Sequence, residues 1–317
     1  MSDQKPPEPS LFRRYTEALA YLTIAAMIGG FFARWWWPLE ALCHPRLQFG
    51  CVLLLLCPLI TWSGGKKLAI AAGVLGVVPF LWVVPLYFGA DPAGESHLRI
   101  EAINVLTSNR DYDEVLSIVE QDDPDVLILI ETDDRWIRGV ASLKEKWPHY
   151  QVASREDNFG IAIFSRIPLT DCRFVPLVDQ RIQAIIAHAQ IDGRDVRIIG
   201  AHPMPPITRK CAALRNRQLE ELKRWAAEHS GPTVLAGDLN LTSYSPYFGD
   251  LLREGKLKDT RQGRGLLHSH SSFASTLRMA IDHILVSDDV LVRKRWVTSC
   301  KGSDHDAVAA DLAISAP

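Results

Sequence analysis

Three long apolar segments fill most of the first ninety residues and divide the chain into two dissimilar parts. They are 18–33, 47–62 and 68–90. A helix needs roughly 20 residues, about 17–25 in practice, to cross the hydrocarbon core of a bilayer. The third segment reaches this length alone, and the first two reach it when flanking tryptophans serve as interfacial anchors. The sequence therefore predicts a polar tail over 1–12 and a membrane anchor of three transmembrane helices over 13–90. One cleaved signal peptide does not explain three segments. The alternative to a membrane anchor is a buried helical hairpin in a soluble protein.

Positive charges are distributed unevenly around the predicted helices and indicate an orientation. Five lie on one side and three on the other. By the positive-inside tendency, the N-terminus then lies in the cytoplasm. We expect a multi-pass protein of the inner (cytoplasmic) membrane, with everything after residue 90 on the extracytoplasmic side. The five are Lys5, Arg13, Arg14, Lys66 and Lys67, and the three are Arg34, Arg46 and Arg99.

After a predicted linker over 91–97, residues 98–317 show a different pattern, in which strands alternate with helices. Local turns such as Asp192-Gly193 join several of the strands, which favours mixed sheets covered by helices over a doubly wound parallel sheet. This part carries 28 Lys and Arg against 31 Asp and Glu, a net charge of −3. That balance excludes a strong, non-specific binder of long nucleic acids.

Two short polar runs near the C-terminal end adjoin apolar stretches that are predicted as buried strands. The runs are Gly237-Asp238-Leu239-Asn240 and Gly302-Ser303-Asp304-His305. Alternate residues of an extended segment share one face, so Asp238 and Asn240 present a carboxylate and an amide together. An imidazole that acts as a base needs an orienting carboxylate. Asp282, which opens an apolar strand, is the best candidate to orient His305.

Three further polar residues lie at or within predicted buried strands, and each has a structural alternative. Glu131 follows the apolar run 125–130, where an uncompensated carboxylate is costly. It either binds a metal ion or makes a structural hydrogen bond. Asn104 either ligates a hard metal, contacts a phosphate or caps the sheet. His202, at the end of the strand 196–201, is either catalytic or structural.

Together these side chains suit one kind of chemistry. Hard carboxylate and amide oxygens favour Mg²⁺, with Mn²⁺ as the alternative, over the Cys and His ligands of structural zinc sites. A His–Asp pair can deprotonate water, and the other groups can neutralise the charge that develops around phosphorus. The sequence therefore predicts metal-assisted attack of water on a phosphate ester.

In their order along the chain, these residues resemble the endonuclease/exonuclease/phosphatase superfamily, which includes deoxyribonuclease I-like nucleases, neutral sphingomyelinases and inositol polyphosphate phosphatases. The resemblance covers about residues 98–315, and the apolar segments ahead of it look like those of bacterial membrane-anchored members. It implies an α/β (α+β) fold, a four-layer sandwich of two mixed β-sheets flanked by helices, and a Mg²⁺-dependent phosphoric ester hydrolase over 98–317. The residues that carry the resemblance are Asn104, Glu131, His202, Asp238, Asn240, Asp282, Asp304 and His305.

The resemblance also implies a metal site. Glu131 would be the principal ligand, with Asn104 and Asp304 nearby. One departure concerns the residue before this glutamate, which is Gln in many relatives and Ile130 here. The change removes one polar contact and leaves the ligand itself.

The implied catalytic residues surround this metal. His305, oriented by Asp282, would act as the base or contact the phosphate. Asp238 and Asn240 would position the nucleophile and stabilise the transition state, and His202 would bind or protonate the phosphate.

Two more residues are candidates for substrate binding. Arg166 follows a stretch that resembles the central strand of the family, and it either reaches a phosphate or is solvated. Asn109 either contacts an anion or lies in a solvated loop.

The sequence does not identify the substrate. The family acts on nucleic acids, lipids and small phosphates, and a fold does not settle a function. A basic cluster between 253 and 264 either is a solvated loop or holds a nucleic acid backbone or anionic lipid head groups. A nuclease acting on DNA or RNA, and a non-catalytic binding protein that keeps the fold, are the alternatives to a general phosphoesterase. The bilayer is an expected partner, and nothing in the sequence indicates an obligate protein partner.

Overall fold

The computed structural model describes residues 10–89, 94–179, 181–272 and 277–315. The chain divides into two compact units, Met1–Pro85 and Leu86–Pro317. Lys5 and most of the predicted tail lie outside the described residues, as does part of the predicted linker.

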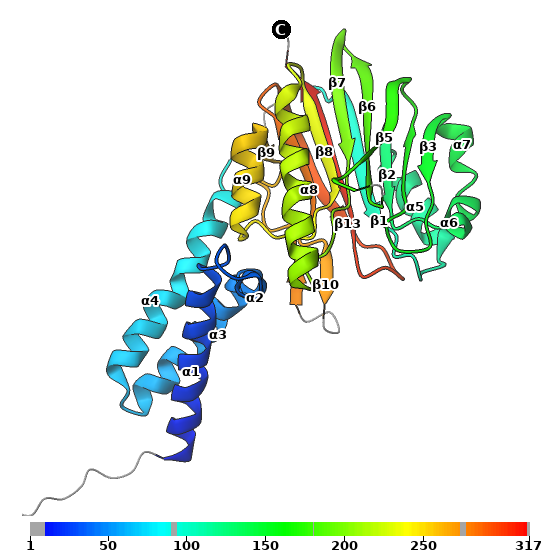
Figure 1. The fold of residues 1–317 in the computed structure, drawn as a ribbon. Helices are drawn as coiled ribbons and strands as arrows, with labels where there is room; N and C mark the ends of the chain where they lie inside the picture. The colour runs from blue at the N-terminus through cyan, green and yellow to red at the C-terminus, as the bar shows by residue number, and fades with distance from the viewer. Residues whose placement is uncertain (1–9, 90–93, 180, 273–276, 316–317) are drawn as a thin grey trace, which may run out of the picture. The chain divides into compact units, whose positions relative to one another are not determined.

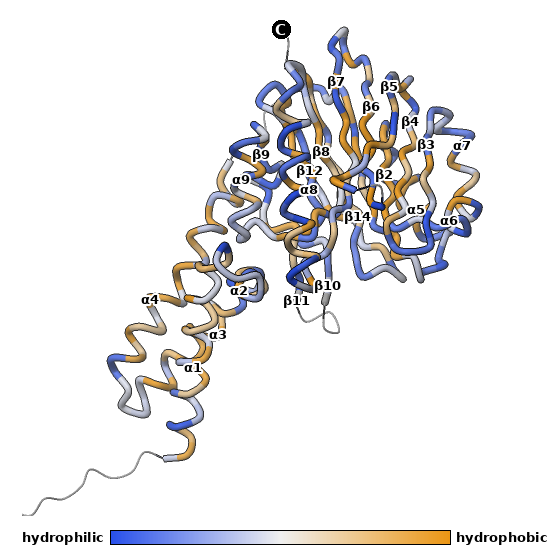
Figure 2. Tube along the Cα trace, in the orientation of Figure 1, coloured by the Kyte–Doolittle hydropathy of each residue, from blue (hydrophilic) through white to orange (hydrophobic). Residues whose placement is uncertain are grey.

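The first unit consists of helices whose outer surfaces are apolar. α3 and α4 approach so closely at Gly50 that a Cβ atom there would lie 2.8 Å from the backbone oxygen of Gly76. Glycine allows this close contact between the two helices. Large apolar side chains such as Leu55 and Ile70 remain exposed, and Figure 2 shows apolar residues along these helices. The helices are α1 (Leu11–Gly30), α2 (Trp37–Ala41), α3 (Arg46–Trp62) and α4 (Lys66–Val83), with the 3-10 turn η1 (Val84–Leu86) after them.

The prediction of three transmembrane helices is supported for one helix only. Over the described residues, Lys66–Leu86 is long and apolar enough to cross a membrane. α3 has 17 residues, or about 25 Å at 1.5 Å per residue, which is shorter than a hydrocarbon core of about 30 Å. α1 has 20 residues, but its first two turns carry Arg13, Arg14 and Glu17 and shorten its apolar part.

The second unit contains two six-stranded mixed sheets (Figure 1). One has the strand order β13-β14-β1-β2-β4-β3, in which β1 and β2 are parallel. The other has the order β5-β6-β7-β8-β12-β9, in which β7 and β8 are parallel. The strands are β1 (Leu98–Asn104), β2 (Val126–Ile130), β3 (His149–Ala153), β4 (Ile161–Ser165), β5 (Leu169–Pro176), β6 (Gln183–Ile191), β7 (Arg194–Gly200), β8 (Thr233–Asp238), β9 (Leu257–Asp259), β12 (Asp282–Ser287), β13 (Val290–Thr298) and β14 (Ala307–Ile314), and β10 (His270–Ser272) pairs with β11 (Leu277–Met279) in a separate hairpin.

The two sheets face each other across one apolar core, and helices cover their outer faces. Ile128 from the first sheet and Ile198 from the second belong to this central cluster. Leu222 of α8 belongs to a second cluster on the outer face of the second sheet, and Trp136 of α6 belongs to a third on the outer face of the first. These helices are α5 (Tyr112–Asp122), α6 (Asp134–Gly139), α7 (Leu143–Lys146), α8 (Arg209–Glu228) and α9 (Pro246–Gly255). The prediction of two mixed sheets flanked by helices is confirmed.

One predicted helix is divided. The sequence favours a single helix over 135–146, but the chain forms α6 and α7 with a break between them. A side chain at Gly139 would lie 2.5 Å from the ring of Tyr112. The chain therefore needs glycine at the end of α6, where its backbone packs against α5.

Candidate active site

The strand ends that carry the predicted polar residues meet at one edge of the two sheets. Asn104 is the last residue of β1, and Asp238 is the last residue of β8. Asp282 opens β12, which runs antiparallel to β8 and places Asp282 directly opposite Asp238. Glu131 and His202 follow β2 and β7, the parallel neighbours of β1 and β8. Five strands of two sheets therefore bring these groups together without long loops.

Asn104 joins the two sheets. Its Nδ2 donates to Glu131 Oε1 at 3.0 Å and to Asp238 Oδ2 at 3.1 Å, and its Oδ1 accepts from the Leu106 backbone N–H at 3.1 Å. The amide thus turns its nitrogen, and not its oxygen, toward the carboxylates. In this orientation Asn104 positions Glu131, and a role of Asn104 as a metal ligand stays a prediction.

Glu131 is held in an unusual conformation. Its φ is 64°, a left-handed backbone that non-glycine residues adopt rarely. Thr107 stabilises it twice, because its Oγ1 donates to the Glu131 carbonyl at 2.9 Å and its N–H donates to Oε2 at 3.3 Å. The side chain is nevertheless only 8% exposed. A buried carboxylate with these two neutral donors, the amides of Asn104 and Thr107, retains a strong demand for positive charge.

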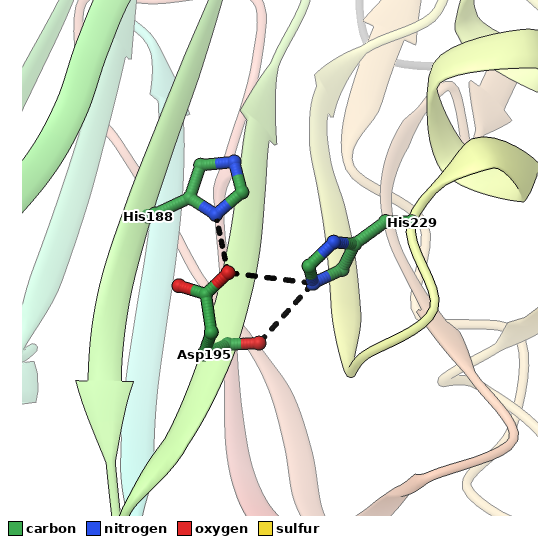
Figure 3. Close-up of side chains that lie close together, drawn as sticks. All are labelled: His188, Asp195 and His229. Atoms are coloured by element: carbon green, nitrogen blue, oxygen red, sulfur yellow. Dashed lines mark hydrogen bonds and ion pairs between the residues drawn. The ribbon is translucent and has the colours of Figure 1, made fainter.

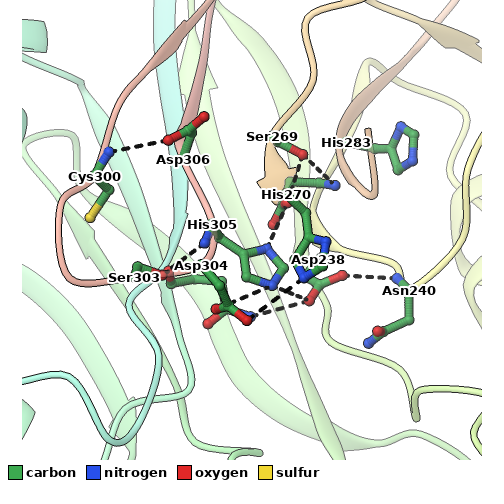
Figure 4. A network of polar contacts seen from close by, with 12 residues as sticks. Asp238, Asn240, Ser269, His270, His283, Cys300, Ser303, Asp304, His305 and Asp306 are labelled. Atoms are coloured by element: carbon green, nitrogen blue, oxygen red, sulfur yellow. Dashed lines mark hydrogen bonds and ion pairs between the residues drawn. The ribbon is translucent and has the colours of Figure 1, made fainter. Parts of the chain in front are cut away.

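His305 lies in a line of polar groups that starts at Ser269 (Figure 4). The Ser269 hydroxyl donates to Asp282 Oδ2 at 2.7 Å, and the same oxygen lies 2.8 Å from His305 Nδ1. Burial lowers the pKa of His305, but the carboxylates of Asp282 and Asp238 outweigh it and raise that pKa to about 10. Asp282 therefore orients the ring and stabilises its charged form.

Asp238 lies between two imidazoles. Its Oδ2 is 3.5 Å from His202 Nε2 and 3.7 Å from His305 Nε2. Its Oδ1 accepts the Asn240 backbone N–H at 2.9 Å, and the Asn240 side chain donates to the Pro203 carbonyl at 3.0 Å. Asp238 and Asn240 are therefore both held in place, but not by the alternation of an extended strand, because β8 ends at Asp238 and Asn240 has a left-handed backbone with φ 52°.

Two predicted substrate-binding residues are not free at this edge. Arg166 follows β4, which is antiparallel to β2, so it lies at the opposite end of the sheet from Glu131. There it pairs with Asp123 and stacks over the ring of Trp147 at 4.6 Å. Asn109 uses its amide within its own loop, since Nδ2 donates to the Val105 carbonyl at 3.2 Å. The expectation that Arg166 reaches a phosphate is therefore wrong, and Asn109 supports a loop.

A family match decides the relationship of this chain to known proteins. The model of the Endonuclease/Exonuclease/phosphatase family matches residues 102–305, which is more than half of the chain. The chain belongs to the endonuclease/exonuclease/phosphatase family. The match spans the strand ends from Asn104 to His305.

Solved structures of the family share the fold. The 3′ phosphatase NExo from Neisseria, bound to a product DNA hairpin, has 22% identity and a TM-score of 0.56, with 67% of this chain and 98% of that chain covered. TDP2 of D. rerio, in complex with a single-strand DNA product, has 14% identity and a TM-score of 0.58, with 68% and 98% covered. Sphingomyelinase C from Streptomyces griseocarneus has 18% identity and a TM-score of 0.52, with 68% and 99% covered. No curated protein matches the chain by sequence.

Sequence patterns did not indicate two residues of this family site, Ser269 and His270. The Ser269 hydroxyl is buried against Asp282, as described above. The ring of His270 contacts that of His305 with a centroid distance of 4.5 Å. The sequence offered one signal, the run His268-Ser269-His270, which matches no motif of known spacing and whose last residue opens β10.

The donor set fits a divalent cation of the kind that the family uses. Glu131, Asp238, Asp282 and Asp304 contribute four carboxylates to one edge, and the ion-pair partners of Asp238 and Asp282 are the imidazoles of His202 and His305. Oxygen donors in excess of positive charge are typical of sites for Mg²⁺ or Mn²⁺. Glu131 and Asp304 would hold the ion, with Asn104 supporting Glu131.

The basic cluster between 253 and 264 is largely paired within its own surroundings. Arg261 is buried against Asp259 at 2.6 Å, and Lys258 pairs with Asp288 at 2.7 Å. Arg253 pairs with Asp250 at 2.7 Å. Because these basic side chains are paired with nearby carboxylates, the cluster is less suited to hold a nucleic acid backbone or anionic lipid head groups.

Proposed function

We propose that this chain is a metal-dependent phosphoesterase that hydrolyses a phosphate ester by attack of water. The observation that carries the proposal is the arrangement of Asp238 between His202 and His305, beside Glu131 and at the shared edge of two sheets. The family to which the chain belongs is named for nucleases and phosphatases, and each of these activities breaks a phosphate ester bond.

Each side chain has a role in this reaction. Asp238, fixed by the Asn240 backbone N–H, orients the attacking water and accepts its proton. His305, whose ring Asp282 holds in place, contacts a phosphate oxygen and stabilises its developing charge. His202 approaches from the other side and assists the leaving oxygen. A divalent cation would neutralise the carboxylates and acidify a bound water.

The substrate class is proposed from the neighbours in fold. Two of them are described with DNA, NExo with a product hairpin and TDP2 with a single-strand product. We therefore place a nucleic acid ester first and a phospholipid second, since one neighbour is a sphingomyelinase. The full chain should be assayed with DNA, RNA, phospholipids and inositol phosphates. Cleavage of the lipids alone would contradict the nucleic acid assignment.

Replacing Glu131 with glutamine tests metal dependence. We expect wild-type hydrolysis to require Mg²⁺ or Mn²⁺ and to stop with a chelator. The Glu131→Gln variant should lose at least about 100-fold in kcat/KM and need more metal, because it lacks the buried negative charge that binds the ion. The measurement is the initial rate as a function of metal concentration. Glu120→Gln, an exposed change on α5, serves as the matched control. Full activity of Glu131→Gln without added metal would contradict the proposal.

We also propose that the N-terminal unit anchors the protein in the inner membrane, with the catalytic unit on the extracytoplasmic side. The apolar helix Lys66–Leu86 and the exposed apolar side chains of its neighbours support this. The full chain should then remain in membranes after washing with alkaline carbonate and dissolve only in detergent. Alkaline phosphatase fused to the C-terminus should be active. Release by carbonate would contradict the anchor, and an inactive fusion would contradict the orientation.

A further inference from the structure

His270 is attached to the loop that carries the Gly-Ser-Asp-His run. It opens β10 and forms an antiparallel bridge with His305. The backbone N–H of Ser271 donates to the Asp304 carbonyl at 3.0 Å. These contacts fix the position of the imidazole beside both Asp304 and His305 (Figure 4).

The two ring nitrogens of His270 have different surroundings, and Nε2 is the one that faces Asp304. Nδ1 is buried without a partner, and Nε2 lies 3.7 Å from Asp304 Oδ2, beyond hydrogen-bond distance. The side chain is only 16% exposed.

The distances suit ligands of one ion better than they suit hydrogen bonds. Asp304 Oδ1 lies 4.0 Å from His305 Nε2, and Asp304 Oδ2 lies 3.7 Å from His270 Nε2. Two ligands of a tetrahedral zinc ion, each about 2.0–2.2 Å from the metal, are roughly 3.4 Å apart. Asp304 is 47% exposed, so its side chain can rotate to close this difference and leave one position open to solvent.

His305 has the support that a metal-binding histidine usually has. Its Nδ1 lies 2.8 Å from Asp282 Oδ2, which directs its Nε2 toward Asp304. A carboxylate behind the non-ligating nitrogen fixes the tautomer and raises the basicity of the ligand.

We propose that His270, Asp304 and His305 form a second cation site, which binds Zn²⁺ or a similar transition-metal ion. Two imidazole nitrogens and one carboxylate select such an ion over Mg²⁺. The site rests on the proposed function because it shares His305 and Asp304 with the hydrolytic site: an ion there withdraws the imidazole from Asp238 and the carboxylate from the catalytic ion, and so inhibits hydrolysis. Zn²⁺ is thus expected to inhibit the Mg²⁺-dependent reaction.

A second group of two histidines and one aspartate differs from the proposed cation site, because its ring nitrogens have hydrogen-bond partners. His188, Asp195 and His229 also place three donor atoms close together (Figure 3). There His188 Nδ1 lies 2.7 Å from Asp195, and Arg197 donates to His188 Nε2 at 3.3 Å. His229 Nε2 donates to the Asp195 carbonyl at 3.1 Å. These nitrogens are satisfied and a guanidinium is adjacent, so this group is a hydrogen-bond network.

Direct binding of Zn²⁺ to the full chain in detergent tests the proposal without any substrate. Competition with a chromophoric chelator should reveal a tight site in the wild type. His270→Ala should bind Zn²⁺ at least tenfold more weakly, whereas His188→Ala, the matched control, should bind as the wild type does. Equal affinity of His270→Ala and the wild type would overturn the proposal.

Two further measurements complete the test. If His270→Ala does not fold, Co²⁺ bound to the wild type should still show the visible absorption of a four-coordinate site with nitrogen ligands. A spectrum of aqueous Co²⁺ would overturn the proposal. Glu131→Gln should keep the Zn²⁺ affinity of the wild type, which separates this site from failure of the proposed hydrolytic function.

Discussion

Replacing His305 with alanine is expected to lower the rate of phosphate-ester hydrolysis by about 10²–10³-fold, the range for loss of a group that stabilises charge in the transition state. The imidazole is buried and lies 2.8 Å from Asp282 and 3.7 Å from Asp238. Alanine removes the group that contacts the phosphate and takes one of several partners from each carboxylate. The measurement is kcat and KM under saturating Mg²⁺. The fall should appear mainly in kcat, because the charge that His305 stabilises develops in the transition state.

Asp282→Asn provides the companion to this change. It preserves shape but removes the charge that orients the ring, so we expect a smaller loss than for His305→Ala. The two effects should not add in the double variant, because Asp282 acts through His305. His149→Ala, on the edge strand β3, is the control. Near-normal kcat in His305→Ala would remove this residue from the mechanism.

Replacing Gly237 with alanine is expected to destabilise the catalytic unit by about 4 kcal/mol, the sum of a steric overlap and backbone strain. The φ of Gly237 is +145°, and a Cβ there would lie 2.0 Å from the backbone oxygen of Ala201. Neither strand can move aside, because β8 is paired with β7 on one side and β12 on the other. The melting temperature should fall by about 10 °C.

A second glycine serves as the control for this prediction. Gly249 lies in α9, and a Cβ there would meet nothing within 4 Å. Gly249→Ala should therefore leave stability unchanged or raise it by up to about 1 kcal/mol, since alanine favours the helix. Thermal melting of both variants, followed by circular dichroism, provides the comparison. Equal melting temperatures for Gly237→Ala and the wild type would show that β8 can shift.

The sequence predicted the central strands well because both faces of these strands are buried. β2 is fully buried and reads as a continuous apolar run. The edge strands β3 and β5 were not predicted, since their residues are mostly half-exposed and β5 contains an irregular register between Thr170 and Arg173. α9 was also not predicted, although Ser245 caps it and Pro246 starts it. Its ten residues were too few for a periodic signal to stand out.

The candidate site could be predicted where its residues adjoin buried strands. Asp238 and Asp282 interrupt apolar runs, and that conflict with burial is visible in one sequence. Ser269 and His270 reach the site through the pairing of a short strand with a loop, which no local pattern encodes. Arg166 was misplaced because a sequence does not tell at which end of a sheet an antiparallel strand finishes.

The pairing of β12 with β8 makes the catalytic geometry a matter of register. Asp282 faces Asp238 only because the ladder aligns His283 with Gly237 and each pair beyond it. A slip of one residue would turn Asp282 to the other face of the sheet. The ladder therefore keeps the two carboxylates opposed by itself. The 22 residues between β9 and β12 deliver Ser269, which holds Asp282, so a change in their length must preserve this contact as well as the ladder.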